Sequence, residues 1–197
     1  MTKENKELSK AIKAVLNTNR YNHTVGVAYT AAALAMKYEF NIDDAMTAGL
    51  LHDCAKGVPN ADKLKMCYEN NISVSEVEEK NPGLLHAKLG EHIARTKYHI
   101  NNSNILSAIR YHTTGRPNMS RLEKLIFVAD YIEPHREIAP NLDKIRMYAF
   151  TNIDLCIYYI VGDTLTYLNN NAIAIDTLTE DTYKYYKLKT GNNVKED

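Results

Sequence analysis

Imidazole and carboxylate side chains recur along this chain at the edges of apolar helical stretches. His52 and Asp53 are adjacent in the stretch LLHDCAK, where the preceding Ala- and Leu-rich residues favour burial. A polar or charged group in such surroundings costs several kcal/mol unless a partner or a metal ion compensates it. Compatible side chains lie elsewhere in the chain, and the full set of candidates is His23, His52, Asp53, His86, His112 and Asp130.

Mixed imidazole and carboxylate ligands suit Fe, Mn, Zn or Ni, whereas a calcium site is built mostly from oxygen. Neighbouring residues on a helix point about 100° apart, so His52 and Asp53 do not clamp a single ion together. They can line one cavity, with Asp53 spanning two ions. Six ligands exceed what one catalytic metal with open positions needs. The set therefore predicts a centre of two metal ions.

Each of these residues also has a simpler interpretation. A lone histidine is more often a hydrogen-bonded structural residue than a ligand, and an aspartate near a helix end is usually a cap. We assign this simpler interpretation to Glu91, His92, His99 and His135. The case for a metal site rests on the ordered set rather than on any one member.

The elements that must position these residues are helices. The composition, 45% hydrophobic and 24% charged over 197 residues, is that of a globular domain and excludes wholesale disorder. Helical periodicity dominates and strand alternation is almost absent. The sequence predicts one all-α domain of roughly eight to ten helices. Beyond an N-terminal amphipathic helix, the predicted ranges are 23–40, 43–53, 61–70, 84–98, 103–112, 120–132, 142–150, 153–169 and 179–188.

Local signals give the expected helix ends. Asp43 and Asn60 are predicted N-caps, and Ser73 with Glu76 has the spacing of a capping box. The Ala-rich helix 23–40 is expected to pack closely against its neighbours. A polar tail, KTGNNVKED, follows the last predicted helix.

Charge and cysteine content narrow the class of protein. Lys+Arg and Asp+Glu both number 24, and this neutral balance disfavours nucleic acid as the main partner. Three widely spaced cysteines argue against a disulfide framework or a zinc ribbon. The chain starts without an apolar signal segment, and its apolar runs are too short to span a bilayer. We expect a cytoplasmic protein that does not bind membranes.

Four strings of this sequence, LLHDCAK, LLHAKLG, AIRYHTTG and FVADYIEPHR, resemble the HD-domain superfamily of metal-dependent phosphohydrolases. The finer resemblance is to the YqeK family of symmetrical diadenosine tetraphosphate hydrolases. It covers roughly residues 18–175, which we expect to form the HD domain, with a helix in 1–17 and a helix plus polar tail in 176–197. The sequence departs from the family pattern at one position. Ala87 follows the third motif histidine, His86, where we expect glycine, and this difference affects local helix packing rather than ligation.

The resemblance implies an all-helical fold around a two-iron centre. By resemblance the ligands are His23, His52, Asp53, His86, His112 and Asp130. Iron is the foremost expectation, with Mn, Co, Ni or Zn as alternatives because imidazole and carboxylate accept several ions. Asp53 is the expected bridge and a catalytic residue.

The implied substrate is heavily anionic, so cations should flank the metals. Lys56 follows Asp53 by three residues and His52 by four, on the same face if the helix continues. Because its ammonium group could reach a phosphate beside the metals, Lys56 is a candidate catalytic and substrate-binding residue. The alternative is a solvated lysine near a helix C-terminus, favoured by the dipole.

Further substrate contacts are expected around the fourth and last motifs. Arg136 has a planar fork suited to phosphate oxygens. His112, Thr113 and Thr114 belong to a hydroxyl-rich turn that can donate hydrogen bonds to the same group, and Arg116 is a weaker candidate. Fourteen tyrosines could include a stacking platform for adenine, but the sequence does not select one.

The expected reaction is hydrolysis of diadenosine tetraphosphate at its centre, with two ADP as products. Two alternatives within HD chemistry are hydrolysis of another nucleotide and a di-iron oxygenase. A third is a nucleotide-binding regulatory HD module, which a missing ligand would favour; none of the six is missing. Oligomeric state, monomer or homodimer, stays open, because the C-terminal tyrosines suit either a core or an interface. These are Tyr158, Tyr159, Tyr183, Tyr185 and Tyr186.

Overall fold

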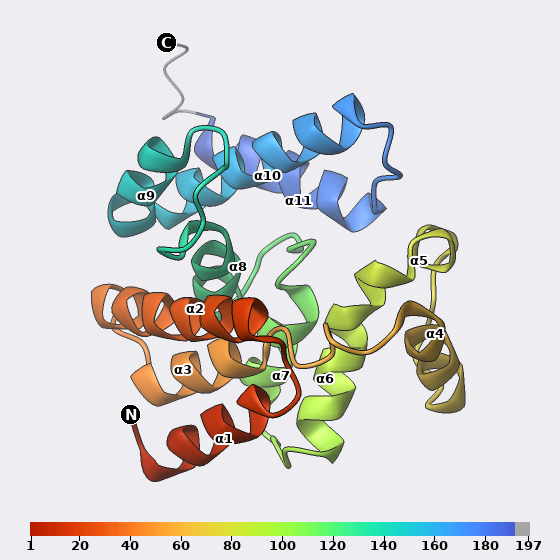
Figure 1. Ribbon diagram of the computed structural model, residues 1–197. Helices are drawn as coiled ribbons and strands as arrows, with labels where there is room; N and C mark the ends of the chain where they lie inside the picture. Colours follow the sequence, from red (N-terminus) through yellow and green to blue (C-terminus); the bar gives the residue numbers. More distant parts are fainter. Residues whose placement is uncertain (192–197) are drawn as a thin grey trace.

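The computed structural model describes residues 1–191, and the regular secondary structure in that range consists of helices without strands (Figure 1). It confirms the predicted all-α class, with eleven α-helices and one 3-10 helix, slightly more than the expected eight to ten. The helices are α1 (Lys3–Lys13), α2 (Thr18–Lys37), α3 (Ile42–Leu51), α4 (Asn60–Glu69), α5 (Glu76–Lys80), η1 (Pro82–Leu85), α6 (His86–Thr96), α7 (Ser103–Tyr111), α8 (Arg121–Ile132), α9 (Leu142–Thr151), α10 (Ile153–Asn170) and α11 (Thr177–Thr190).

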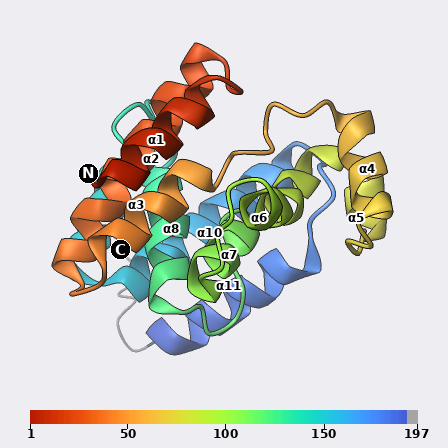
Figure 2. The ribbon, with the colours of Figure 1, turned by 90° about the horizontal axis from the view of Figure 1, so that it is seen from below.

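Helix α8 lies at the centre and connects two groups of helices. Helices α1, α2 and α3 lie on one side, whereas α9, α10 and α11 form a layer on the other, at the top of Figure 1. Helices α4 and α5 lie at the edge of the molecule in both views (Figure 2). The central helices α2, α3, α7 and α8 pack on one another, and their ends carry the candidate site residues.

The expected close packing of the Ala-rich helix is confirmed. Ala28 and Ala31 of α2 and Ala45 and Ala48 of α3 are fully buried. At Gly49 the two helices approach so closely that an added Cβ would lie 2.7 Å from the Cα of Ala28. Small side chains on both helices therefore let α2 and α3 come together and bring their ends close to each other.

Two predicted caps are displaced. Asn41, rather than Asp43, caps α3 by accepting from the Asp44 amide, while Asp43 lies in the first turn, where a carboxylate favours the helix dipole. Helix α4 has Pro59 at its N-cap, and Asn60 is its first residue.

The predicted capping box is also displaced, by two residues. Ser75 and Glu78 form the box at the start of α5, instead of Ser73 and Glu76. Both pairs have the same spacing, so the local pattern alone does not separate them.

The C-terminal tyrosines pack within the chain. The rings of Tyr158 and Tyr183 stack at 5.4 Å between α10 and α11, and Tyr186 is fully buried. Helix α11 runs to Thr190, two residues beyond the predicted end, and the rest of the predicted polar tail lies mostly outside the described residues. None of the helices in residues 1–191 is long and apolar enough to cross a membrane.

Candidate metal centre

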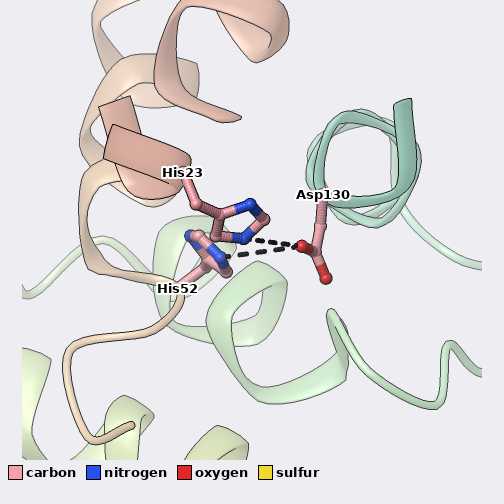
Figure 3. A group of neighbouring side chains, drawn as sticks. All are labelled: His23, His52 and Asp130. Atoms are coloured by element: carbon pink, nitrogen blue, oxygen red, sulfur yellow. Dashed lines mark ion pairs between the residues drawn. The ribbon is translucent and has the colours of Figure 1, made fainter. Parts of the chain in front are cut away.

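Six residues from five parts of the chain meet at the centre of the molecule. His23 lies in α2 and Asp130 in α8, whereas His52 and Asp53 directly follow the end of α3. His86 begins α6, and His112 follows the last residue of α7. The structure thus brings together all six predicted residues. Figure 3 shows His23, His52 and Asp130 pointing toward one another from three separate elements.

Asp53 lies between two pairs of histidines. Its Oδ2 is 3.9 Å from Nε2 of His23 and 3.5 Å from Nε2 of His52. Its Oδ1 is 3.4 Å from Nε2 of His86 and 3.7 Å from Nε2 of His112. Each carboxylate oxygen therefore faces a different pair, which is the arrangement that a carboxylate shared by two ions requires.

Asp130 lies beside the first pair. Its Oδ1 is 3.0 Å from Nε2 of His23 and 3.9 Å from Nε2 of His52 (Figure 3). In the second pair, the Nε2 atoms of His86 and His112 are 3.1 Å apart. Two overlapping groups have ligand atoms within 4.8 Å of one another, His23 with His52 and Asp130, and His52 with Asp53 and His112. The expectation that the neighbours His52 and Asp53 do not approach one ion together is therefore wrong, because both lie just beyond the end of α3 and their ligand atoms are 3.5 Å apart.

The histidine rings are held by their Nδ1 atoms. In His52, His86 and His112, Nδ1 donates to the carbonyl oxygen three residues earlier, at 2.7, 2.6 and 2.7 Å. His23 is different, because its Nδ1 is 3.1 Å from the carboxylate of Glu133. A proton on Nδ1 leaves the Nε2 lone pair facing the cluster, which is the tautomer that binds metals.

The pKa shifts of His52, His86 and Asp53 favour the protonation states that a metal site needs, whereas the carboxylates of Asp130 and Glu133 raise the pKa of His23 despite its burial. Burial lowers the pKa of His52 and lowers that of His86 to about 3, so both rings are neutral near pH 7. Burial would raise the pKa of Asp53, but its electrostatic interactions with the surrounding histidine rings, those of His52 first, hold it well below its usual value. Neutral imidazoles and an ionised carboxylate are the forms that ligate metals.

Two ring nitrogens in the cluster lack hydrogen bonds. Nε2 of His23 and Nε2 of His52 are buried and have no hydrogen-bond partner of acceptable geometry among the described residues. Because buried polar atoms are nearly always satisfied, these atoms call for an additional partner. A metal ion fits, since both lone pairs face Asp53 and Asp130.

The predicted cations and hydroxyls differ in how closely they approach the cluster. Helix α3 ends at Leu51, so Lys56 lies on a turn, yet its Nζ is 3.3 Å from Nε2 of His86. Nη2 of Arg136 is 3.6 Å from Oδ1 of Asp130. Oγ1 of Thr113 is 3.3 Å from Nε2 of His112.

The side chains of Thr114 and Arg116, two other predicted substrate contacts, bind other groups of the protein. The Thr114 hydroxyl donates to the carbonyl oxygen of Gly115. Arg116 forms an ion pair at 2.9 Å with the buried Glu123 of α8. The nearby Cys54 is buried, and its Sγ contacts the carbonyl oxygen of Gly90, so this residue packs between neighbouring helical segments.

Sequence reasoning missed two residues that contact the cluster. Nη1 of Arg20 donates to Oδ2 of Asp53 at 2.8 Å, and the buried Glu133 holds His23. Arg20 precedes His23 by three residues, and Glu133 follows Asp130 by three. This spacing places each on the same side of its helix as a predicted ligand, and it is the signal that could have identified them.

Comparisons with known proteins find a family model, curated relatives and a solved structure that are similar to this chain. The family model described as HD domain matches residues 20–135. The symmetrical bis(5'-nucleosyl)-tetraphosphatase of Halalkalibacterium halodurans is 39% identical over 85% of this chain and 89% of its own. Its namesake in Bacillus subtilis is 36% identical over 87% of this chain and 92% of its own.

A solved structure has a similar fold. It is that of a predicted HD superfamily hydrolase involved in NAD metabolism from Clostridium acetobutylicum. The two structures superpose with a TM-score of 0.90 at 32% identity, covering 93% of this chain and 97% of the other.

Proposed function

The chain belongs to the HD domain family, and we propose that it hydrolyses diadenosine tetraphosphate symmetrically, with two ADP as products, at a centre of two metal ions. The enzyme class rests on the similarity to symmetrical bis(5'-nucleosyl)-tetraphosphatases over most of both chains. The observation that carries the two-metal centre is the position of Asp53, whose two oxygens face two separate histidine pairs. We also propose that the protein is cytoplasmic, that it is a monomer or a homodimer, and that its HD domain spans residues 18–175.

The six clustered residues are suited to hold the two ions. His23, His52, Asp130 and Oδ2 of Asp53 would hold one, and His86, His112 and Oδ1 of Asp53 the other. When bound, such a pair of ions lowers the pKa of water and neutralises charge on phosphoryl oxygens. Iron is the proposed metal, and the same ligands also suit Mn, Co, Ni or Zn.

Protein cations flank the cluster at both ends and would orient the phosphates. On one side, the partly exposed Arg20 lies beside Asp53 and the partly exposed Arg136 lies beside Asp130. On the other side, Lys56 lies beside His86. The hydroxyl of Thr113 is close enough to donate to a phosphoryl oxygen near His112. These groups would bind the polyphosphate and limit its motion, which lowers the entropic part of the barrier.

The test is elemental analysis of the purified protein combined with a product assay. We expect about two transition-metal ions per chain and ADP as the sole product from diadenosine tetraphosphate. Chelation should abolish activity, and anaerobic addition of Fe²⁺ or Mn²⁺ should restore it. Absence of bound metal together with no activity after this addition would refute the proposal, and a mixture of ATP and AMP would refute symmetrical cleavage.

Replacement of Glu133 by glutamine should weaken metal binding at the His23 end. The glutamine keeps the size of the side chain but removes the anionic acceptor that orients His23, and such outer contacts contribute roughly 10- to 100-fold in metal affinity. Gly26→Ala should act similarly, because a Cβ at this position would lie 2.5 Å from Oε2 of Glu133. Titration with Mn²⁺ should show one weakened site of two.

A matched control is Glu91→Gln. Glu91 pairs with Arg95 and Arg110 and makes no contact with the six clustered residues within the part of the chain described. The Glu91→Gln variant should therefore bind both metal ions with the wild-type affinity. Equal affinities in wild type and Glu133→Gln, with circular dichroism unchanged, would remove Glu133 from this role.

A further inference from the structure

An apolar hollow of about 950 Å³ opens between α2 and α9, close to the metal cluster. One wall is a stripe along α2 that includes Val25, Gly26 and Tyr29, and the opposite wall includes Phe150 of α9 and Ile132. Two aromatic rings in this hollow are unusually accessible, with Tyr29 56% exposed and Phe150 40% exposed. Exposed aromatic rings on the walls of one apolar hollow are typical of a binding site for a planar ligand.

A second hollow, of about 1050 Å³, joins the first and is polar. It is lined by Arg20, His23 and Arg136, and therefore reaches the metal cluster directly. Asn22 and His135 line both hollows and mark their junction.

Glu133 and Glu137 also line the polar hollow, but Glu133 is engaged by His23 and by the His135 amide. Arg146 lines the apolar hollow and donates to backbone carbonyl oxygens. From the cluster outward the lining therefore changes from charged side chains that include two arginines, through polar groups, to apolar and aromatic side chains.

We propose that the apolar hollow binds the nucleobase of one nucleoside of the substrate, with Tyr29 and Phe150 stacking on it. The order of the two hollows matches the order of groups in a nucleotide, since phosphate, ribose and base follow one another in the same way. Arg20 and Arg136 would contact phosphates, and Asn22 at the junction would face the ribose hydroxyls. The Asn22 carboxamide makes no hydrogen bond within residues 1–191, so its donors and acceptor are free.

This inference rests on the proposed function in one respect, namely that the polyphosphate lies at the metal cluster. The sequence left the adenine platform undecided among fourteen tyrosines. The structure narrows the choice, because Tyr158, Tyr183 and Tyr186 are engaged between α10 and α11. Tyr21 and Tyr29 line the hollow that continues to the metal cluster, and of these two the Tyr21 hydroxyl is hydrogen-bonded to Ser9, whereas Tyr29 is exposed.

The experiment measures binding of two probes, ADP and inorganic triphosphate, to the metal-loaded full chain by calorimetry. Tyr29→Ala and Phe150→Ala should each weaken ADP binding about tenfold, the size of one lost stacking contact. Inorganic triphosphate has no base, so its dissociation constant should not change. Tyr167→Ala is the matched control, since Tyr167 is 60% exposed on α10 and lines neither hollow.

Three results would overturn the proposal. The first is unchanged ADP affinity in both variants. The second is an equal loss for ADP and inorganic triphosphate, which would place the defect at the phosphate site. The third is a dimer that dissociates in Tyr29→Ala while ADP affinity is retained, which would make the hollow an interface between two copies of the chain.

Hydrolysis of diadenosine tetraphosphate by the wild type is measured in parallel and tests the proposed function separately. Loss of ADP affinity in the variants, with no hydrolysis by the wild type, would refute the proposed hydrolysis but support the nucleobase site. Normal hydrolysis by the wild type, with unchanged ADP affinity in the variants, would refute only the base site.

Discussion

Asp53→Asn should lower the rate of diadenosine tetraphosphate hydrolysis roughly a thousandfold, because it removes the charge shared by both proposed ions. Asparagine has one neutral carbonyl oxygen, and an NH2 group that only donates replaces the second oxygen, so it cannot present an anionic oxygen to each histidine pair. Asp53 also accepts a 2.8 Å hydrogen bond from Arg20, and this ion pair is lost as well. The bound metal, measured by elemental analysis, should fall together with the rate constant.

The control for this substitution is Asp163→Asn. Asp163 is a partly buried carboxylate that accepts from Asn141 and lies outside the cluster. It should keep the wild-type metal content and rate. An Asp53→Asn protein with two bound metals and near wild-type turnover would contradict the bridging role, whatever its stability.

The second large effect is expected on stability. Gly49→Ala should lower the free energy of unfolding by roughly 2 kcal/mol, because its Cβ would lie 2.7 Å from the Cα and 3.0 Å from the amide nitrogen of Ala28. Alanine is the better helix former by up to about 1 kcal/mol, but overpacking against a backbone costs about 1–3 kcal/mol or more. Overpacking should dominate, since backbone atoms cannot rotate away as a side chain does.

Gly162→Ala provides the matched control in another helix. Its Cβ would meet only Cε2 of Tyr183, at an ordinary contact distance of 3.5 Å. This variant should gain about 0.5–1 kcal/mol from helix propensity. Urea unfolding of the two variants should therefore shift the midpoint in opposite directions, and a stabilised Gly49→Ala protein would contradict the close packing of α2 on α3.

Activity should fall with stability in Gly49→Ala. Any increase in the spacing of α2 and α3 separates His23, carried by α2, from His52, which directly follows α3. The hydrolysis rate measured well below the unfolding temperature should be lower than that of Gly162→Ala.

Local features of the fold were accessible to sequence reasoning. The all-α class and most helices were predicted, because apolar periodicity and capping side chains act within a few residues. The errors are local as well. The caps at Asn41 and Ser75 were assigned to Asp43 and Ser73, since several capping residues lie close together at both helix starts.

The candidate site was predicted in its members but not in its arrangement. The six residues have the right chemistry and follow recognisable motifs, so their sequence context is enough to select them. Arg20 and Glu133 were missed because an arginine and a glutamate on helical stretches are ordinary surface residues until a packed neighbour is known. Lys56 was expected on the same face as His52 and Asp53 if the helix continued, but α3 ends at Leu51 and Lys56 lies near His86 on a turn.

The sequence by itself predicted the helical class from its periodicity, the six candidate ligands from residue types and motif order, and the phosphohydrolase chemistry from the resemblance to the HD-domain superfamily. Only the tertiary structure decided that Asp53 lies between two histidine pairs, that Glu133 holds His23, and that Tyr29 lines a hollow leading to the cluster. The physical reason is that these contacts join residues far apart in the chain. Their distances depend on how closely α2, α3 and α8 pack, and no local pattern encodes that separation.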